Sequence, residues 1–182
     1  MPPIDGTSLV RRTYQDKFGA SISPAFTRYL SQGGERAQAV LGFRRAGDGP
    51  LFLEAYLDRP IQLEVEQAFG RPIARDAIVE IGNFAATNAM AMVELWGAAA
   101  NDLGNRNEVA VATLTAQLRH AFSRIGIPIA VIAAAEPHRL GEASRTWGRY
   151  YQADPRVCAG IIAQGQEAIG AFLARRASRK VA

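Results

Sequence analysis

The fold of this chain is decided by the stretch Ile78-Val79-Glu80-Ile81-Gly82-Asn83-Phe84-Ala85-Ala86. Its apolar residues predict a buried strand, and this strand carries one carboxylate, Glu80. An ionisable group in apolar surroundings must be neutralised, paired or used in chemistry. Gly82 interrupts the strand, and a glycine there often marks a bulge or the close approach of another molecule. The stretch therefore predicts a strand split to admit a ligand beside a carboxylate. The alternative is a core strand in which Glu80 pairs with an arginine.

Length and composition predict one globular domain over residues 1–182. Of these residues 48% are hydrophobic and 21% are charged, which is ordinary for a folded protein. The chain has 21 basic and 17 acidic side chains, and its net charge is +4. No basic stripe is interleaved with stacking aromatic residues, so the sequence does not favour a nucleic acid as partner.

Other compositional signals exclude several classes of site. Cys158 is the single cysteine, and His120 and His138 lie far apart, so we expect no metal site and no tightly bound cofactor. The N-terminus lacks the basic-then-apolar pattern of a secretory signal, which predicts a cytoplasmic location. The longest apolar run, residues 127–135, is about half of the ~20 residues that a membrane-spanning helix needs.

The first third of the chain reads as one helix and two strands. Residues 1–20, rich in proline and glycine, are expected to be an irregular N-terminal segment. A short helix is predicted over residues 23–32, where Ser23 is the cap and Pro24 the first helical residue. Residues 37–45 and 51–57 are predicted to be strands, and the turn between them makes an antiparallel hairpin.

The remainder alternates between strands and helices. Helices are predicted over residues 61–69, 89–103 (capped by Asn88) and 116–125 (capped by Thr115), and strands over residues 78–86, 108–114, 128–135 and 156–161. Residues 166–182 form a basic C-terminal tail. Crossovers through a helix join parallel strands with a right-handed turn. The fold class is therefore α/β, with one mixed central sheet and helices on both of its faces.

This order of elements is similar to that of the GNAT acyltransferase fold. Residues 80–85, Glu-Ile-Gly-Asn-Phe-Ala, resemble a strand of the acyl-homoserine lactone (autoinducer) synthases that reads Glu-(Ile/Leu)-Ser-Arg-Phe-Ala. A longer resemblance, over residues 50–165, is to the thermostable hemolysin family. Its matching stretches are residues 56–60 (Tyr-Leu-Asp-Arg-Pro), 78–86, 118–126 (Leu-Arg-His-Ala-Phe-Ser-Arg-Ile-Gly), 147–151 (Trp-Gly-Arg-Tyr-Tyr) and 154–160 (Asp-Pro-Arg-Val-Cys-Ala-Gly).

The resemblance implies an N-acyltransferase that moves an acyl group from a phosphopantetheine thioester to an amine. In that fold the donor arm lies where two strands separate and pairs with an exposed strand edge. A backbone N–H near Gly82, Asn83 or Phe84 is then placed to donate to the thioester oxyanion.

Transfer to an amine also needs a base, and a carboxylate with a raised pKa suits that task. Glu80 is the first candidate and Glu54 the second. Glu54 shares a strand face with Phe52 and Tyr56, and the alternative for it is a face turned to solvent.

Further candidates lie in the second half of the chain. Trp147 and Tyr150 are expected to wall an acyl pocket, with Tyr151 giving a proton to the leaving thiolate; the alternative is a packed aromatic corner. Arg119 is expected to grip a phosphate or an acidic carrier, and a solvated helix-face charge is the alternative.

The donor is expected to be an acyl carrier protein rather than acyl-CoA. Residues 85–91 contain neither the glycines nor the arginine of a pyrophosphate-binding loop. Acyl carriers are acidic, which suits the arginine excess of this chain. The likeness to the lactone synthases raises S-adenosylmethionine as a candidate substrate. Asn83 replaces the arginine of their motif, so their amino-acid acceptor is not carried over.

Two other functions stay open. One is a membrane-active protein of the hemolysin type, because a helix over residues 166–177 would set Ile169, Phe172 and Leu173 against a basic tail. The other is a binding module with a catalytically inactive GNAT fold.

Overall fold

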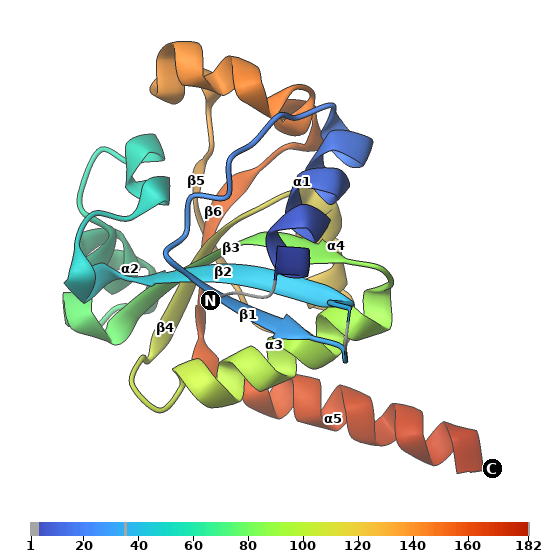
Figure 1. Cartoon of the computed structure of the whole chain (residues 1–182). Helices are drawn as coiled ribbons and strands as arrows, with labels where there is room; N and C mark the ends of the chain where they lie inside the picture. Colours follow the sequence, from blue (N-terminus) through green and yellow to red (C-terminus); the bar gives the residue numbers. More distant parts are fainter. Residues whose placement is uncertain (1–3, 35, 182) are drawn as a thin grey trace.

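The structure is a computed structural model that describes residues 4–34 and 36–181 (Figure 1). Its helices are α1 (Ile4–Phe18), α2 (Ile61–Phe69), α3 (Ala89–Leu103), α4 (Ala116–Ile125) and α5 (Ile162–Val181). Its strands are β1 (Arg28–Gln32), β2 (Ala39–Arg45), β3 (Ile78–Ala86), β4 (Val109–Leu114), β5 (Ala130–Ala134) and β6 (Arg156–Ile161). Short 3₁₀ helices span Ala46–Asp48, Phe52–Tyr56, Arg75–Ala77, Pro137–Trp147 and Tyr150–Ala153.

One mixed sheet runs through the molecule in the order β1-β2-β3-β4-β6-β5 (Figure 1). Within the described residues only β3 and β4 pair in parallel, and their register covers three residue pairs, from Ile78–Val109 to Glu80–Val111. Beyond Glu80 the two strands continue without pairing to each other. The sheet is therefore split in its centre.

Helices cover both faces of this sheet. One face packs against α3, α4 and α5 around a core that includes Leu41, Val79, Trp96, Leu114 and Phe122. The other face packs at one end against α2 and the Phe52–Tyr56 helix, and at the other end against α1. The split in the sheet thus lies between two filled layers.

Most of the elements predicted from sequence are present. Strands β2, β3, β4, β5 and β6 and helices α2, α3 and α4 lie at the predicted places, within a few residues. The two predicted caps are also confirmed: the Asn88 side chain accepts from Ala91 N at 2.9 Å, and the Thr115 hydroxyl accepts from Leu118 N at 3.4 Å.

The expectation of an irregular segment over residues 1–20 was wrong for Ile4–Phe18, which is the helix α1, and residues 1–3 lie outside the described residues. Leu9, Val10 and Tyr14 of α1 are buried against the sheet. Gly6 does not break the helix; a Cβ there would lie 3.4 Å from Val40, so the glycine permits close approach to β2.

The predicted helix over residues 23–32 and the strand over 51–57 were also wrong. Residues 28–32 form β1, which takes the antiparallel place beside β2 that the prediction gave to residues 51–57. The Phe52–Tyr56 segment is a 3₁₀ helix because two carboxylates take its backbone donors. Glu80 accepts from Phe52 N and Leu53 N, and Glu54 accepts from Leu51 N.

The tail begins earlier than expected, since α5 starts at Ile162 and runs beside α3 (Figure 1). Within the described residues, no helix combines the length and the apolar character needed to cross a membrane.

Candidate functional site

The predicted bulge lies in β3, one residue beyond Gly82. Between Val40 and Gly42 the register of β2 slips against β3, and Asn83 adopts a positive φ of 51°. Asn83 is buried, and its Nδ2 donates to the Tyr29 hydroxyl at 3.1 Å. A positive φ in a non-glycine residue costs energy that the surrounding contacts must hold, and such residues gather at functional sites.

Two glycines make room for an aromatic ring beside this bulge. Gly42 and Gly82 face each other across β2 and β3, and the Phe26 ring lies over both. A Cβ on Gly42 would lie 2.7 Å from the Phe26 ring, and one on Gly82 would lie 2.8 Å from it. Because Gly42 and Gly82 have no side chains, the Phe26 ring can pack directly on β2 and β3 beside the split.

Glu80 lies at the point where β3 and β4 separate. It is 3% exposed, and its two oxygens accept from Phe52 N at 2.8 Å and Leu53 N at 3.0 Å. Burial raises the pKa of its carboxyl to about 7, although these hydrogen bonds and the charge of Arg44 act in the opposite sense. A carboxyl with that pKa is balanced between its two protonation states near neutral pH, as a general base requires.

The alternative of a core ion pair is not what the structure shows. Arg44 stands opposite Glu80 in the strand register, but its guanidinium donates to the carbonyls of Ala25 and Pro50, each at 3.1 Å. Among the described residues, no ion pair joins Glu80 to an arginine or lysine.

Three hollows meet at the split, and we name the first the Glu80 chamber. Aromatic side chains from α1, the segment before β1, the Phe52–Tyr56 helix and the segment before β6 surround the carboxylate. The chamber is lined by Tyr14, Phe26, Phe52, Tyr56, Glu80, Ile81, Gly82, Asn83, Thr113, Trp147 and Tyr150.

The second hollow, the split cleft, runs between the unpaired ends of β3 and β4. Its volume is about 400 Å³, and it opens between α1 and the N-terminal ends of α3 and α4. It shares Tyr14, Thr113 and Tyr150 with the Glu80 chamber, so the two hollows adjoin.

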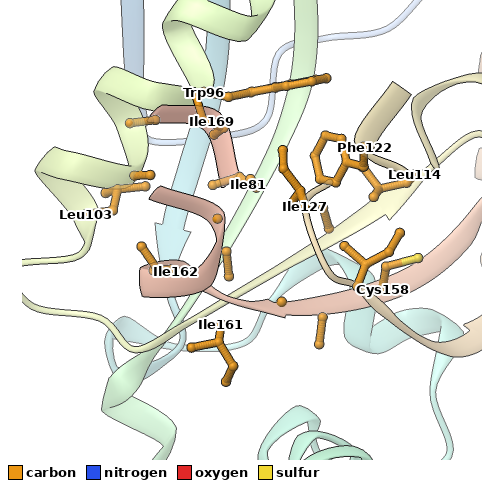
Figure 2. Close-up of a pocket in the computed structure, with 18 of the residues that line it drawn as sticks. Ile81, Trp96, Leu103, Leu114, Phe122, Ile127, Cys158, Ile161, Ile162 and Ile169 are labelled. Carbon is orange, nitrogen blue, oxygen red and sulfur yellow. The ribbon is translucent and has the colours of Figure 1, made fainter. Parts of the chain in front are cut away.

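The third hollow, the apolar cavity, has a volume of about 80 Å³ and lies on the opposite face of the sheet. In Figure 2 side chains of α3, α4 and α5 converge there with side chains of β3, β4 and β6. Ile81 lines both this cavity and the Glu80 chamber, and Trp96 lines both this cavity and the split cleft. Trp96 is buried, and its Nε1 has no hydrogen-bond partner among the described residues.

Glu54, the second candidate base, lies in different surroundings from Glu80. Its carboxylate forms a two-point ion pair with Arg75, at 2.6 and 2.9 Å, and also accepts from Ile61 N at 3.0 Å. The Arg75 hydrogen bonds lower the pKa of Glu54 to about 2. So acidic a group is a weak base, and these contacts hold the segment between β2 and α2 in place.

The candidate aromatic residues are divided between the chamber and its edge. Trp147 and Tyr150 line the Glu80 chamber, where they pack with Tyr14 in an aromatic cluster. Tyr151 is not among the lining residues, but its hydroxyl lies 2.8 Å from that of Tyr56, which does line the chamber. Burial and the nearby charge of Glu80 both raise the pKa of Tyr56.

Arg119 lies outside all three hollows and its hydrogen bonds are internal. It donates to the carbonyls of Leu114 and Asp154 at 2.7 and 2.6 Å and pairs with the Asp154 carboxylate at 2.5 Å. This arginine therefore joins α4 to the turn before β6. Its engagement there disfavours the predicted binding of a phosphate or an acidic carrier by Arg119.

Several residues of the site were missed by sequence reasoning. Tyr14 falls in the expected irregular segment and Phe26 in the predicted helix over residues 23–32, and Trp96 was not singled out as a site residue within the predicted helix over residues 89–103. The signal that could have found Tyr14 is its spacing from Leu9 and Val10, which places all three on one helix face.

A sequence comparison supports the resemblance found in these motifs. The model of the thermostable hemolysin family matches residues 5–166. The chain belongs to that family. No curated protein matches it significantly.

Solved structures similar to this family member show the fold. TofI in its apo form is 15% identical with a TM-score of 0.63, and the match covers 91% of this chain and 87% of TofI. FeeM, an N-acyl amino acid synthase from uncultured soil microbes, is 15% identical with a TM-score of 0.61, over 90% of this chain and 92% of FeeM. The acyl-homoserine lactone (AHL) synthase LasI is 14% identical with a TM-score of 0.60, over 90% of this chain and 84% of LasI. The expected single-domain, GNAT-like acyltransferase fold is thus confirmed.

Proposed function

We propose that this protein is an N-acyltransferase that moves an acyl group from a phosphopantetheine thioester to an amine. One observation carries the proposal: a buried carboxylate with a pKa of about 7 lies where three hollows meet at a split sheet. The likeness of the fold to an AHL synthase and an N-acyl amino acid synthase supports it.

Each hollow suits one part of the reaction. The split cleft has a volume of about 400 Å³ and is bordered by the edges of β3 and β4 that do not pair with each other, which suits an extended phosphopantetheine arm. The apolar cavity suits the acyl chain, in place of the pocket that the sequence placed at Trp147 and Tyr150. The Glu80 chamber suits the amine, since it contains the candidate base.

The chemistry follows from this arrangement. The amine nitrogen attacks the thioester carbon, and Glu80 takes the amine proton directly or through a water molecule. A backbone N–H of the bulge, at Gly82, Asn83 or Phe84, donates to the oxygen as it gains negative charge. The Phe84 backbone already hydrogen-bonds with the Tyr14 hydroxyl, which leaves Gly82 and Asn83 as the stronger candidates.

Collapse of the intermediate breaks the carbon–sulfur bond and releases a thiolate. We assign the proton for that thiolate to the hydroxyl pair of Tyr56 and Tyr151, of which Tyr56 is the member in the chamber. The proton that Glu80 took from the amine then returns to the tyrosinate, directly or through water, which restores both groups. The products are an N-acyl amide and a free phosphopantetheine thiol.

An acyl carrier protein is the donor that we favour over acyl-CoA. The Asn88 side chain occupies the N–H of Ala91, which takes up one of the free donors at the start of α3. Together with the lack of glycine in residues 85–91, this leaves a poor cradle for a pyrophosphate. The net charge of +4 suits an acidic carrier.

The membrane-active alternative loses its main support in the structure. The apolar residues Ile169, Phe172 and Leu173 of α5 pack against the core rather than facing outward. The exposed end of α5 beyond them is basic and carries no large apolar side chain over residues 174–180. A cytoplasmic location stays a prediction.

The test is a direct assay for N-acyl products by mass spectrometry. The purified protein is given an acyl carrier or an acyl-CoA of matched chain length, with a mixture of primary amines and S-adenosylmethionine. We expect an amide, formed faster from the carrier, and at least about 100-fold slower formation with Glu80→Gln. Glu142→Gln, at an exposed carboxylate that lines none of the three hollows, is the matched control. Absence of amide from every combination would overturn the proposal, and an undiminished rate in Glu80→Gln would remove Glu80 as the base.

A further inference from the structure

The part of the Glu80 chamber that the structure describes has one carboxylate in its lining and no basic side chain. Among its described lining residues, Glu80 is the sole acidic side chain and there is no arginine, lysine or histidine. The rest of the lining is aromatic, apolar, or neutral and polar, as in Asn83 and Thr113.

Three basic side chains near the chamber, those of Arg11, Lys17 and Arg44, do not line it. Arg44 donates to the carbonyls of Ala25 and Pro50, and Lys17 lines the split cleft rather than the chamber. Arg11 is near enough to lower the pKa of Tyr29 but is an exposed residue of α1. None of these three lines the chamber.

The neutral donors are also partly occupied. Asn83 Nδ2 donates to the Tyr29 hydroxyl, and the Tyr56 hydroxyl shares a hydrogen bond with Tyr151. The backbone N–H groups of Phe52 and Leu53 donate to Glu80 itself. A second carboxylate would therefore enter the chamber beside an anion and without a charged partner.

The chamber is expected to stabilise the ammonium group of an amino acid and to destabilise its carboxylate group. An ammonium group gains from the Glu80 carboxylate and from the faces of surrounding aromatic rings. A carboxylate loses its water, meets a like charge, and finds no cation to compensate. The chamber has a volume of about 40 Å³ and takes only the amino group. The substituent on the amine therefore extends into the adjoining split cleft, where Phe18, Phe84 and Trp96 favour an apolar or flat group.

We propose that the acceptor of this enzyme is a primary amine that bears no carboxylate and carries an apolar or aromatic substituent, such as an arylalkylamine. This inference rests on the proposed function and narrows its acceptor. It disfavours free amino acids and S-adenosylmethionine, since each carries a carboxylate next to the amine that must react.

Matched pairs of acceptors test the inference. Phenethylamine is compared with phenylalanine and tyramine with tyrosine, and S-adenosylmethionine is added as a separate arm, all with one acyl donor. We expect kcat/KM to be at least about 30-fold higher for the amine of each pair, because the carboxylate stays unpaired. An amino acid or S-adenosylmethionine that reacts as well as the amines would overturn the inference and leave the proposed function standing.

A binding measurement tests the inference even if no acyl transfer is observed. Isothermal titration calorimetry of the same pairs should show binding of phenethylamine and at least about 10-fold weaker binding of phenylalanine. Amine binding without acyl transfer would uphold the inference and overturn the proposed function. Equal binding of both members, or binding of neither, would overturn the inference.

A variant that adds a cation supplies the converse test. Thr113 lies on the part of β4 that does not pair with β3 and lines the chamber, so Thr113→Lys places an ammonium group beside it. We expect the ratio of amine to amino-acid acceptance to fall at least about 10-fold. Ser123→Lys, at an exposed position of α4, adds the same charge away from the chamber and should keep the wild-type ratio. The same ratio in the wild type and Thr113→Lys would contradict the inference.

Discussion

At the residue scale, Glu80 is a carboxyl group on which opposing effects act. Its hydrogen bonds from Phe52 N and Leu53 N and the charge of Arg44 favour the ionised form, but burial disfavours it more strongly. The result is a pKa of about 7, against an ordinary value of 4.5. The folded protein thus retains a proton that the unfolded chain has released at pH 6.

This difference predicts how stability depends on pH. Because the folded-state pKa of Glu80 is raised, its contribution is fully present below pH 4.5 and is lost as pH rises through 7. Between pH 5 and pH 7 we expect the unfolding free energy of the wild type to fall by about 2 kcal/mol relative to Glu80→Gln. Urea unfolding of both proteins at several pH values measures this. Parallel curves would show that the pKa of Glu80 is not raised.

Glu54 should behave in the opposite way. Its folded-state pKa is lowered to about 2, so its contribution is present above pH 4.5 and is lost as pH falls toward 2. At pH 7 we expect Glu54→Gln to lower the unfolding free energy by about 2–4 kcal/mol, since Arg75 loses a partly buried partner. Thermal or urea unfolding checks this. Arg71→Gln, which removes one side of the exposed pair with Glu108, is the control and should cost less than about 1 kcal/mol.

These two glutamates show what the sequence can predict of a site. The burial of Glu80 follows from its apolar neighbours, which lie next to it in the chain. The ion pair of Glu54 does not, because Arg75 is 21 residues away and no periodic pattern links the two. The bulge was predicted from Gly82, yet the residue with positive φ is Asn83, since the position of a bulge depends on the register with β2.

At the scale of elements, the predictions failed where tertiary contacts replaced local ones. Residues 51–57 alternate like a strand, but the backbone donors of Leu51, Phe52 and Leu53 go to the side chains of Glu54 and Glu80 rather than to a neighbouring strand. Residues 28–32 became the edge strand beside β2 instead. Capped helices and apolar strands in the second half of the chain were predicted well, because their signals are local.

The packing of Phe26 on paired glycines gives a prediction at this scale. Gly82→Ala would place a Cβ 2.8 Å from the Phe26 ring, so we expect an overpacking cost of about 1–3 kcal/mol in unfolding free energy. In a Phe26→Ala background the same change should cost less than about 0.5 kcal/mol, because the clash is gone. A double-mutant cycle by urea unfolding measures the coupling. An equal loss of unfolding free energy in both backgrounds would contradict a close contact between position 82 and the Phe26 ring.

At the scale of the whole molecule, the split in the sheet connects its two faces. Ile81 and Trp96 stand between the apolar cavity on one side and the chamber and cleft on the other. A donor that reached through the split would have its thioester near Glu80 and its acyl chain among α3, α4 and α5 (Figure 2). The element order predicted the sheet, but the hollows arise from side chains of distant segments and were not predictable from it.

Filling the apolar cavity should therefore shorten the preferred acyl chain. Ala112 is buried and lines the cavity, so Ala112→Leu occupies space that we assign to the chain. We expect the preference for butanoyl over acetyl donors to fall at least about 10-fold, since each lost methylene contact is worth about 0.8 kcal/mol. Competition between the two donors, read by mass spectrometry, measures this. Ala98→Leu, at an exposed position of α3, should leave the preference unchanged. An unchanged preference in Ala112→Leu would place the chain elsewhere.

The central claim is that Glu80, at the split of the sheet, is the base of an acyl transfer, and a pH–rate profile tests it most directly. Single-turnover transfer from an acyl carrier to an arylalkylamine is followed from pH 5 to pH 9 in the wild type and in Glu80→Gln. Because the base acts when ionised, the wild-type rate should rise with pH with a midpoint of about 7. Glu80→Gln should lack this rise and be at least about 100-fold slower at pH 8. A Glu80→Gln profile with the same midpoint and a comparable rate would contradict the claim.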